Sequence, residues 1–158
     1  MESICKKEYK TFEEFNKDSI HLAEYIRNNS FGFNEIQRVS YARKFFTKEV
    51  LNSYLKIAYL NEGVINLLGC RSNILLFSMD NMIKNRLSHP EVTNEDYLKI
   101  IFIAKNPSKY YKTKSGYDVV LFKEDEKCYK LVIKTTKNRK ENFVKSFHLL
   151  NKERYDKY

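Results

Sequence analysis

The chain has 158 residues, 42% of them hydrophobic and 15% aromatic, with a formal net charge of +9 at pH 7. This composition excludes a disordered chain, and the length suits one domain, or a small domain with a helical appendage. No apolar run approaches the roughly 20 residues that a membrane helix needs, and the first residues lack the apolar core of a signal peptide. We therefore expect a cytoplasmic protein without a membrane segment.

Nothing in the sequence predicts a metal or cofactor site. Cys5, Cys70 and Cys128 are odd in number and lack C-x-x-C spacing, which argues against both a disulfide framework and a zinc site. The chain contains no P-loop, G-x-G-x-x-G, H-E-x-x-H or G-x-S-x-G motif. We expect chemistry, if any, from His, Lys and hydroxyl side chains alone.

Helical patterns fill the first part of the chain. Thr11-Phe12-Glu13-Glu14 has the form of a capping box and predicts a helix to about Asn28. A second helix is expected over Glu35–Phe46, and Thr47 would cap a third that continues through Tyr54, Leu55 and Ala58. Because the helical pattern ends near residue 70, we expect a helical region over 1–70 and a second domain over 71–158, or one compact unit containing both.

The remainder alternates helix and strand signals and then becomes strand-like. Ile74–Phe77 predicts a buried strand, and Ser78 would cap a helix that ends before Pro90. Thr93 would cap the next helix, which stops at Asn106-Pro107. Four strands are then expected, over Tyr110–Lys114, Tyr117–Lys123, Lys127–Thr136 and Asn142–Leu150. The predicted fold is α+β, with a four-stranded antiparallel sheet.

The positive charge is concentrated in the strand-rich segment. Residues 1–104 hold 14 basic and 13 acidic residues, whereas residues 105–158 hold 15 basic and 7 acidic residues. A local net charge of +8 suits a polyanion such as RNA, because each Lys or Arg set against a phosphate releases counterions. A lysine-rich solvated surface and an acidic protein partner are the two alternatives.

The last two expected strands form a hairpin around a basic turn. Aligning their apolar faces, with Phe143, Phe147 and Leu149 together, predicts a register in which Lys134 pairs with Ser146. Lys134, Thr136, Ser146 and His148 would then share one open face. The basic residues expected to contact RNA are Lys130, Lys137, Arg139, Lys140 and Lys145.

Two further sets of residues are candidates for function. His89 is expected where a helix ends before Pro90, a position that favours the imidazolium and faces solvent or a cleft. An ordinary surface histidine at a helix end is the alternative. The aromatic residues that would stack on bases are Tyr110, Tyr111, Tyr117 and Tyr129, with core packing as their alternative role.

Several of these motifs, in this order, resemble a nuclease family. They are Ser88-His89-Pro90-Glu91-Val92-Thr93, then Asp96-Tyr97, Val132-Ile133-Lys134-Thr135-Thr136 and Val144-Lys145-Ser146-Phe147-His148. Over about residues 73–158 the chain resembles the phage-associated branch of the Barnase–EndoU–colicin–RelE-like (BECR) nucleases. The resemblance implies a helical piece on a four-stranded antiparallel sheet and a metal-independent ribonuclease of toxin type. It also implies catalytic roles for His89, Lys134 and Ser146, with His148 and Thr136 as further candidates.

This resemblance agrees with simple RNA chemistry. The 2′-hydroxyl attacks the adjacent phosphate, so the protein supplies a base, an acid and positive charge, and leaves 2′,3′-cyclic phosphate and 5′-hydroxyl ends. RNA, with tRNA as one candidate, and an acidic immunity or antitoxin protein are the expected partners. A non-catalytic RNA-binding or phage-structural module is the alternative function.

Overall fold

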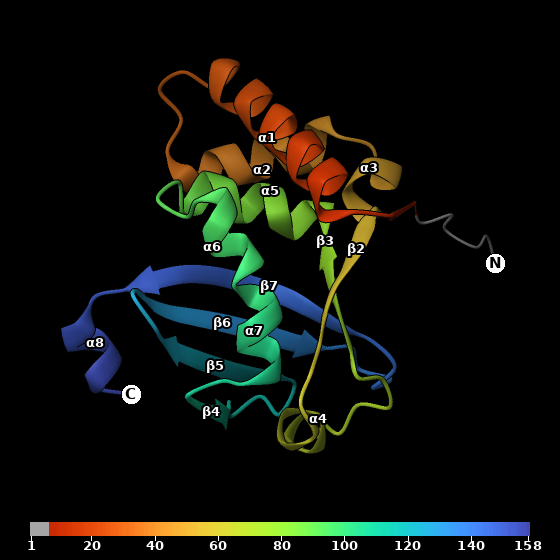
Figure 1. The fold of residues 1–158 in the computed structure, drawn as a ribbon. Helices are drawn as coiled ribbons and strands as arrows, with labels where there is room; N and C mark the ends of the chain where they lie inside the picture. The colour runs from red at the N-terminus through yellow and green to blue at the C-terminus, as the bar shows by residue number, and fades with distance from the viewer. Residues whose placement is uncertain (1–6) are drawn as a thin grey trace. The chain divides into compact units, whose positions relative to one another are not determined.

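The computed structural model describes residues 7–158, in which helices pack with one mixed β-sheet. Its seven described strands follow the order β1-β2-β3-β7-β6-β5-β4 (Figure 1). The predicted α+β class is confirmed, whereas the prediction of a four-stranded antiparallel sheet is wrong. Strands β4 to β7 form the expected antiparallel meander, but β3 pairs in parallel with β7, and β1 pairs in parallel with β2.

The chain divides into two compact units, each made from two segments. The first unit comprises residues 1–56 and 77–90, and the second comprises residues 57–76 and 91–158. The sequence predicts a boundary near residue 70, or one compact unit. The chain passes from one unit to the other within β2 (Tyr54–Tyr59) and again within β3 (Ile74–Ser78).

The first unit is mainly helical. Its elements are β1 (Glu8–Tyr9), α1 (Phe12–Asn28), α2 (Glu35–Phe45), α3 (Lys48–Asn52) and α5 (Met79–Ser88), with the start of β2 and the end of β3. The Thr11 side chain accepts from the Glu14 backbone N–H, which confirms the predicted start of α1. Arg86 of α5 donates to the buried Ser19 hydroxyl at 2.8 Å and to the Asn16 side chain, so polar bonds join α1 to α5.

The predicted third helix is too long. It ends at Asn52, and the following residues form strand β2. Ser53 has an extended backbone, its hydroxyl donates to the Val50 carbonyl, and the Tyr54 N–H bonds to the Lys7 carbonyl. The apolar spacing at Tyr54, Leu55 and Ala58 fits a helix locally, but pairing with β1 decides in favour of a strand.

The second unit holds the antiparallel meander. Its elements are α4 (Glu62–Leu68), α6 (Asn94–Leu98), α7 (Ile100–Lys105), β4 (Lys109–Lys112), β5 (Asp118–Glu124), β6 (Cys128–Thr135), β7 (Asn142–Leu150) and α8 (Lys152–Asp156), with the end of β2 and the start of β3. The helix predicted after Thr93 is present but divided at Lys99, and α8 is not predicted by the sequence reasoning. Cys70 and Cys128 are buried free thiols; Cys5 lies outside the described residues.

A buried acid connects α6 to β6. Asp96 is only 2% exposed, and it accepts hydrogen bonds from the Tyr129 hydroxyl at 2.8 Å, Lys127 Nζ at 3.1 Å and the Thr93 N–H at 2.9 Å. Burial alone would raise the pKa of Asp96, but the hydrogen bonds from Thr93, Tyr129 and Lys127 outweigh it and lower that pKa below its usual value. The carboxylate thus starts α6 as part of a capping box and holds it against the sheet.

Replacing this carboxylate should destabilise the protein in a pH-dependent way. Because the folded pKa of Asp96 is depressed, its contribution is present above the unfolded pKa of about 4 and is lost as pH falls below it. We expect Asp96→Asn to lower the free energy of unfolding by about 1–3 kcal/mol near neutral pH. Urea titrations of both proteins at about pH 7 and about pH 3 should show this difference shrinking in acid. Glu95→Gln, an exposed neighbour in the same helical turn, is the control, and an equal loss in that variant would contradict the role of Asp96.

Candidate functional site

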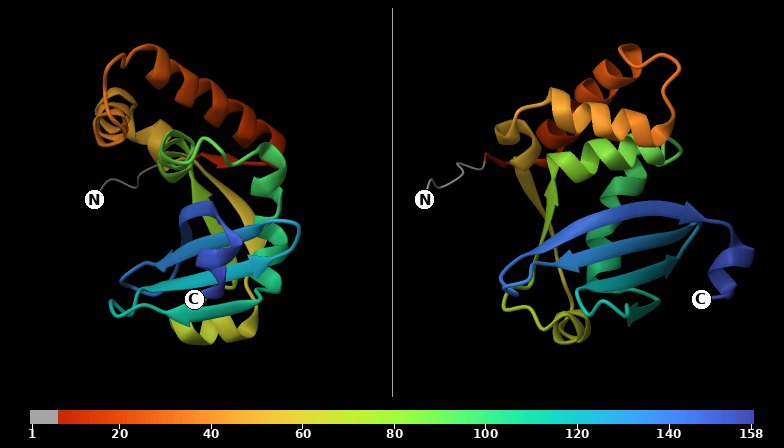
Figure 2. Two further views of the ribbon diagram at one scale, coloured as in Figure 1. Left: turned by 90° about the vertical axis from the view of Figure 1, so that its left-hand side faces the viewer. Right: turned by 180° about the vertical axis from the view of Figure 1, so that it is seen from behind.

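The two faces of strands β5, β6 and β7 have different surroundings. On one face Leu131 and Phe147 are fully buried, and Phe147 meets Tyr97 of α6 at a ring distance of 5.9 Å. Helix α7 crosses the meander on this side, in front of the strands in Figure 1 and behind them in the right-hand view of Figure 2. The other face, called the open face below, carries most of the predicted polar site residues.

Strand pairing arranges the open face in three rows, because cross-strand partners lie on the same side of a sheet. Each row is named after one member. The His148 row is Lys109, Phe122, Lys130 and His148; the Ser146 row is Tyr111, Val120, Val132 and Ser146; the Lys134 row is Asp118, Lys134 and Phe143.

The predicted register between the last two strands is wrong. Lys134 pairs with Phe143 rather than Ser146, and Ser146 pairs with Val132. Val144 and Phe147 are both fully buried although they are three residues apart, so the strand contains one extra residue, Lys145. This bulge also places Phe143 on the open face, whereas strict alternation predicts it beside Phe147.

The corrected register brings a different lysine opposite His148. Lys130 is its direct partner, and both side chains are half-buried. Ser146, also half-buried, lies in the middle row, between Lys130 of the His148 row and Lys134. On strands β6 and β7 the open face therefore combines an imidazole, a hydroxyl and two ammonium groups within neighbouring rows.

The Lys134 row contains an acid that is already paired. Asp118 is the cross-strand partner of Lys134, and its Oδ2 accepts from Lys145 Nζ at 2.8 Å. The side chain of Asp118 is 13% exposed, whereas Lys134 is exposed. Lys145, placed by the bulge outside the row, thus balances Asp118, and the positive charge of Lys134 is left over.

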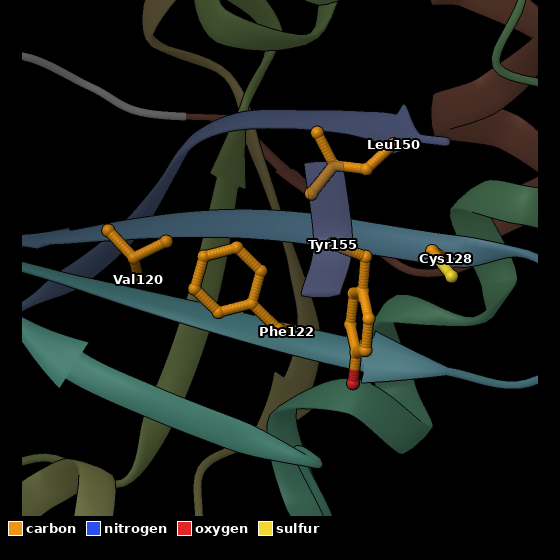
Figure 3. Close-up of a cluster of buried hydrophobic side chains, with 5 residues drawn as sticks. All are labelled: Val120, Phe122, Cys128, Leu150 and Tyr155. Carbon is orange, nitrogen blue, oxygen red and sulfur yellow. The ribbon is translucent and has the colours of Figure 1, made fainter. Parts of the chain in front are cut away.

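Helix α8 partly covers the His148 row. Tyr155 belongs to a buried cluster with Val120, Phe122, Cys128 and Leu150, which Figure 3 shows in close-up. Tyr158 stacks on Phe122 with ring centroids 4.6 Å apart, and Lys130 Nζ lies 5.1 Å from the Tyr158 ring centroid. The positive charge of Lys130 is the main cause of a lowered pKa of Tyr158.

The turn between β6 and β7 holds Arg139 in a structural role. Its backbone has φ of 61°, and its Nη1 donates to the carbonyls of Leu68 at 2.6 Å and Gly116 at 3.0 Å. The guanidinium also lies 4.5 Å from the Tyr117 ring centroid. These contacts join the turn to the end of α4 and to the loop between β4 and β5, whereas the sequence predicts an RNA contact for Arg139.

The other predicted turn residues differ in exposure. Lys137 and Lys140 are exposed, as an RNA contact requires. Thr136 donates from its hydroxyl to Asn138 Oδ1 at 2.6 Å and accepts from the Glu141 N–H, so its side chain shapes the turn. Thr136 follows the end of β6 and is not one of the paired residues that form the rows.

His89 belongs to the first unit. It is the C-cap residue of α5, as the sequence predicts, and its N–H bonds to the Asn85 carbonyl at 2.8 Å. The remaining predicted catalytic residues belong to the second unit. The candidate site defined by the three rows therefore does not include His89.

Of the four tyrosines predicted to stack on bases, Tyr111 has the most suitable position. Tyr111 is 44% exposed on the open face, whereas Tyr129 is buried and bonded to Asp96. Sequence reasoning missed Lys109, Phe122 and Tyr158. The alternation of side chains along a strand does not predict that Lys109 and Phe122 are cross-strand partners. No local sequence signal indicates that α8 packs against them.

The first unit contains a cavity of about 660 Å³ that the sequence does not predict. Its described lining residues are Lys7, Tyr9, Asp18, His21, Leu22, Glu49, Val50 and Ser53. The Tyr9 hydroxyl donates to Asp18 Oδ2 at 2.6 Å; burial is the main cause of a raised pKa of Tyr9. None of the predicted site residues is among the described residues of this lining.

Comparison with protein-family models, curated proteins and solved structures finds no match to the chain. The resemblance of residues 73–158 to BECR nucleases therefore stays a prediction. Within residues 7–158 there is no group of three or more His, Cys, Asp or Glu side chains that would hold a metal ion. The described helices include none that is long and apolar enough to cross a membrane.

The contacts of Arg139 predict a loss of stability when its side chain is removed. We expect Arg139→Ala to lower the free energy of unfolding by about 1–3 kcal/mol, because the carbonyls of Leu68 and Gly116 lose charged donors. Urea unfolding of Lys140→Ala, its exposed neighbour in the same turn, provides the matched control. Equal stability of both variants and the unaltered protein would contradict this structural role.

Proposed function

We propose that this protein is a metal-independent ribonuclease whose reaction takes place on the open face of the second unit. One observation carries the proposal: Lys130 and His148 are direct cross-strand partners, and Ser146 lies in the adjacent row. Fold class alone does not specify a function, so the proposal rests on the chemistry of these side chains.

Each residue of this site suits one part of RNA cleavage. Imidazole is a common general acid and base in enzymes, so His148 is the candidate to take the proton of the 2′-hydroxyl or to protonate the leaving 5′-oxygen. Lys130 and Lys134 supply positive charge for the pentavalent phosphorane, and Ser146 donates a hydrogen bond to a phosphate oxygen. The reaction leaves a 2′,3′-cyclic phosphate and a 5′-hydroxyl.

The surrounding charge supports RNA as the substrate. The segment from residue 105 to residue 158 carries a formal net charge of +8, and the one acid of the Lys134 row is paired with Lys145. Exposed Lys137 and Lys140 extend this charge along the turn. Such a surface attracts a polyanion and makes its affinity fall as salt rises.

The proposal is tested by incubating the purified protein with total bacterial RNA in EDTA. We expect discrete fragments with cyclic phosphate ends, and a rate roughly 10²- to 10⁴-fold lower for His148→Ala, the range typical of a lost proton-transfer group. His21→Ala, an exposed histidine of α1, is the matched control and should cleave like the unaltered protein.

Three results would contradict parts of this proposal. Equal cleavage by His148→Ala removes His148 from the reaction. Loss of activity in His89→Ala alone would instead assign the reaction to a site that includes the end of α5. Salt-sensitive binding without cleavage by any variant would favour a non-catalytic RNA-binding module.

A further inference from the structure

An aromatic stack borders the proposed reaction site. Phe122 is fully buried, and two more exposed rings stack on it: Tyr158 at 4.6 Å with an interplanar angle of 29°, and Tyr111 at 5.9 Å with an angle of 26°. Tyr111 is 44% exposed and Tyr158 is 42% exposed. We call these three residues the aromatic platform. The platform offers accessible ring surface on a rigid, buried support.

Two lysines lie close to rings of the aromatic platform. Lys130 Nζ lies 5.1 Å from the Tyr158 ring centroid, and Lys109 Nζ lies 5.7 Å from that of Phe122. Lys109 also donates to the carbonyls of Tyr155 at 2.8 Å and Tyr158 at 2.7 Å, which fixes α8 against β4. Aromatic rings flanked by fixed positive charges are the features with which proteins bind single-stranded nucleic acid.

The strand register relates the platform to the proposed reaction site. Tyr111 and Ser146 are the two ends of one row across four neighbouring strands, a separation of roughly 14 Å at the usual strand spacing. Between them lie Val120, which is buried in the cluster that contains Tyr155, and the partly buried Val132. A base stacked on Tyr111 therefore belongs to a nucleotide near the reacting phosphate but not at it.

We infer that Tyr111 and Tyr158 hold an unpaired base of a single-stranded RNA whose reacting phosphate lies at Ser146 and His148. This inference rests on the proposed function and narrows its substrate class to RNA that is single-stranded at this site. Bases paired in a duplex keep their faces stacked on one another, so they cannot lie on the platform rings. The platform acts in binding, and it takes no part in proton transfer.

Binding is measured separately from cleavage by using an RNA analogue that cannot react. The probe is a short single-stranded oligonucleotide of 2′-O-methyl nucleotides with one 2-aminopurine, whose fluorescence falls when the base stacks. We expect the probe to be quenched on binding and Tyr111→Leu to bind it roughly 5- to 150-fold more weakly, the range for one base–aromatic contact. Tyr59→Leu, a 59%-exposed tyrosine on β2, is the control and should bind like the unaltered protein.

Four further measurements complete the test. Tyr158→Leu should also weaken binding, and thermal unfolding of each variant verifies that it is folded. The probe annealed to its complement should bind more weakly than the single strand. With cleavable RNA, Tyr111→Leu should raise KM and leave kcat nearly unchanged, whereas His148→Ala should lower kcat.

The outcomes of this experiment separate the two proposals. Binding without quenching, undiminished by either tyrosine substitution, overturns the platform whatever the cleavage assay gives. Equal or tighter binding of the duplex overturns it as well. Quenched, tyrosine-dependent binding of the single strand without any cleavage supports the platform and contradicts the proposed ribonuclease reaction.

Discussion

The pairing of β6 with β7, and the single extra residue within it, determine the chemistry of the second unit. Val144 and Phe147 both turn inward, so Lys145 bulges out of the ladder and the register differs by one residue between its two sides. The bulge sets His148 opposite Lys130 and Ser146 opposite Val132. It also brings Lys145 to within 2.8 Å of Asp118. One inserted residue therefore decides that Lys145 pairs with Asp118 and that Lys130 lies opposite His148.

The open face depends on how firmly the opposite face is held. Tyr129 stacks on Phe147 at 5.6 Å with an interplanar angle of 9°, and its hydroxyl donates to the buried Asp96. Asn142 at the start of β7 donates from Nδ2 to the carbonyls of Ser72 and Ile74, so the segment leading into β3 fixes that end of the strand. Packing and buried hydrogen bonds on one side thus keep the rows on the other side in register.

Helix α8 gives the open face a defined limit. Tyr155 fills the cluster above Phe122 and Leu150, and Lys152 pairs with Glu124 at 2.6 Å. The cluster under the helix buries Phe122 of the His148 row and Val120 of the Ser146 row, whereas Tyr111 is exposed and Ser146 and His148 are half-buried. His148 and Ser146 form the polar end of this face, and Tyr111 and Tyr158 form its aromatic end. Both proposals therefore concern the same face.

The sequence by itself determined the local features of this protein. Helix caps at Thr11, Ser78 and Thr93, the end of α5 at His89 and the four strands of the meander follow from hydrogen-bonding side chains and periodicity within a few residues. Tertiary structure decided the rest, because the deciding contacts join residues far apart in the chain. Pairing with β1 made Tyr54–Tyr59 a strand, burial of Val144 and Phe147 shifted the hairpin register, and distant carbonyls engaged Arg139. The rows that define the candidate site exist only once those contacts have formed.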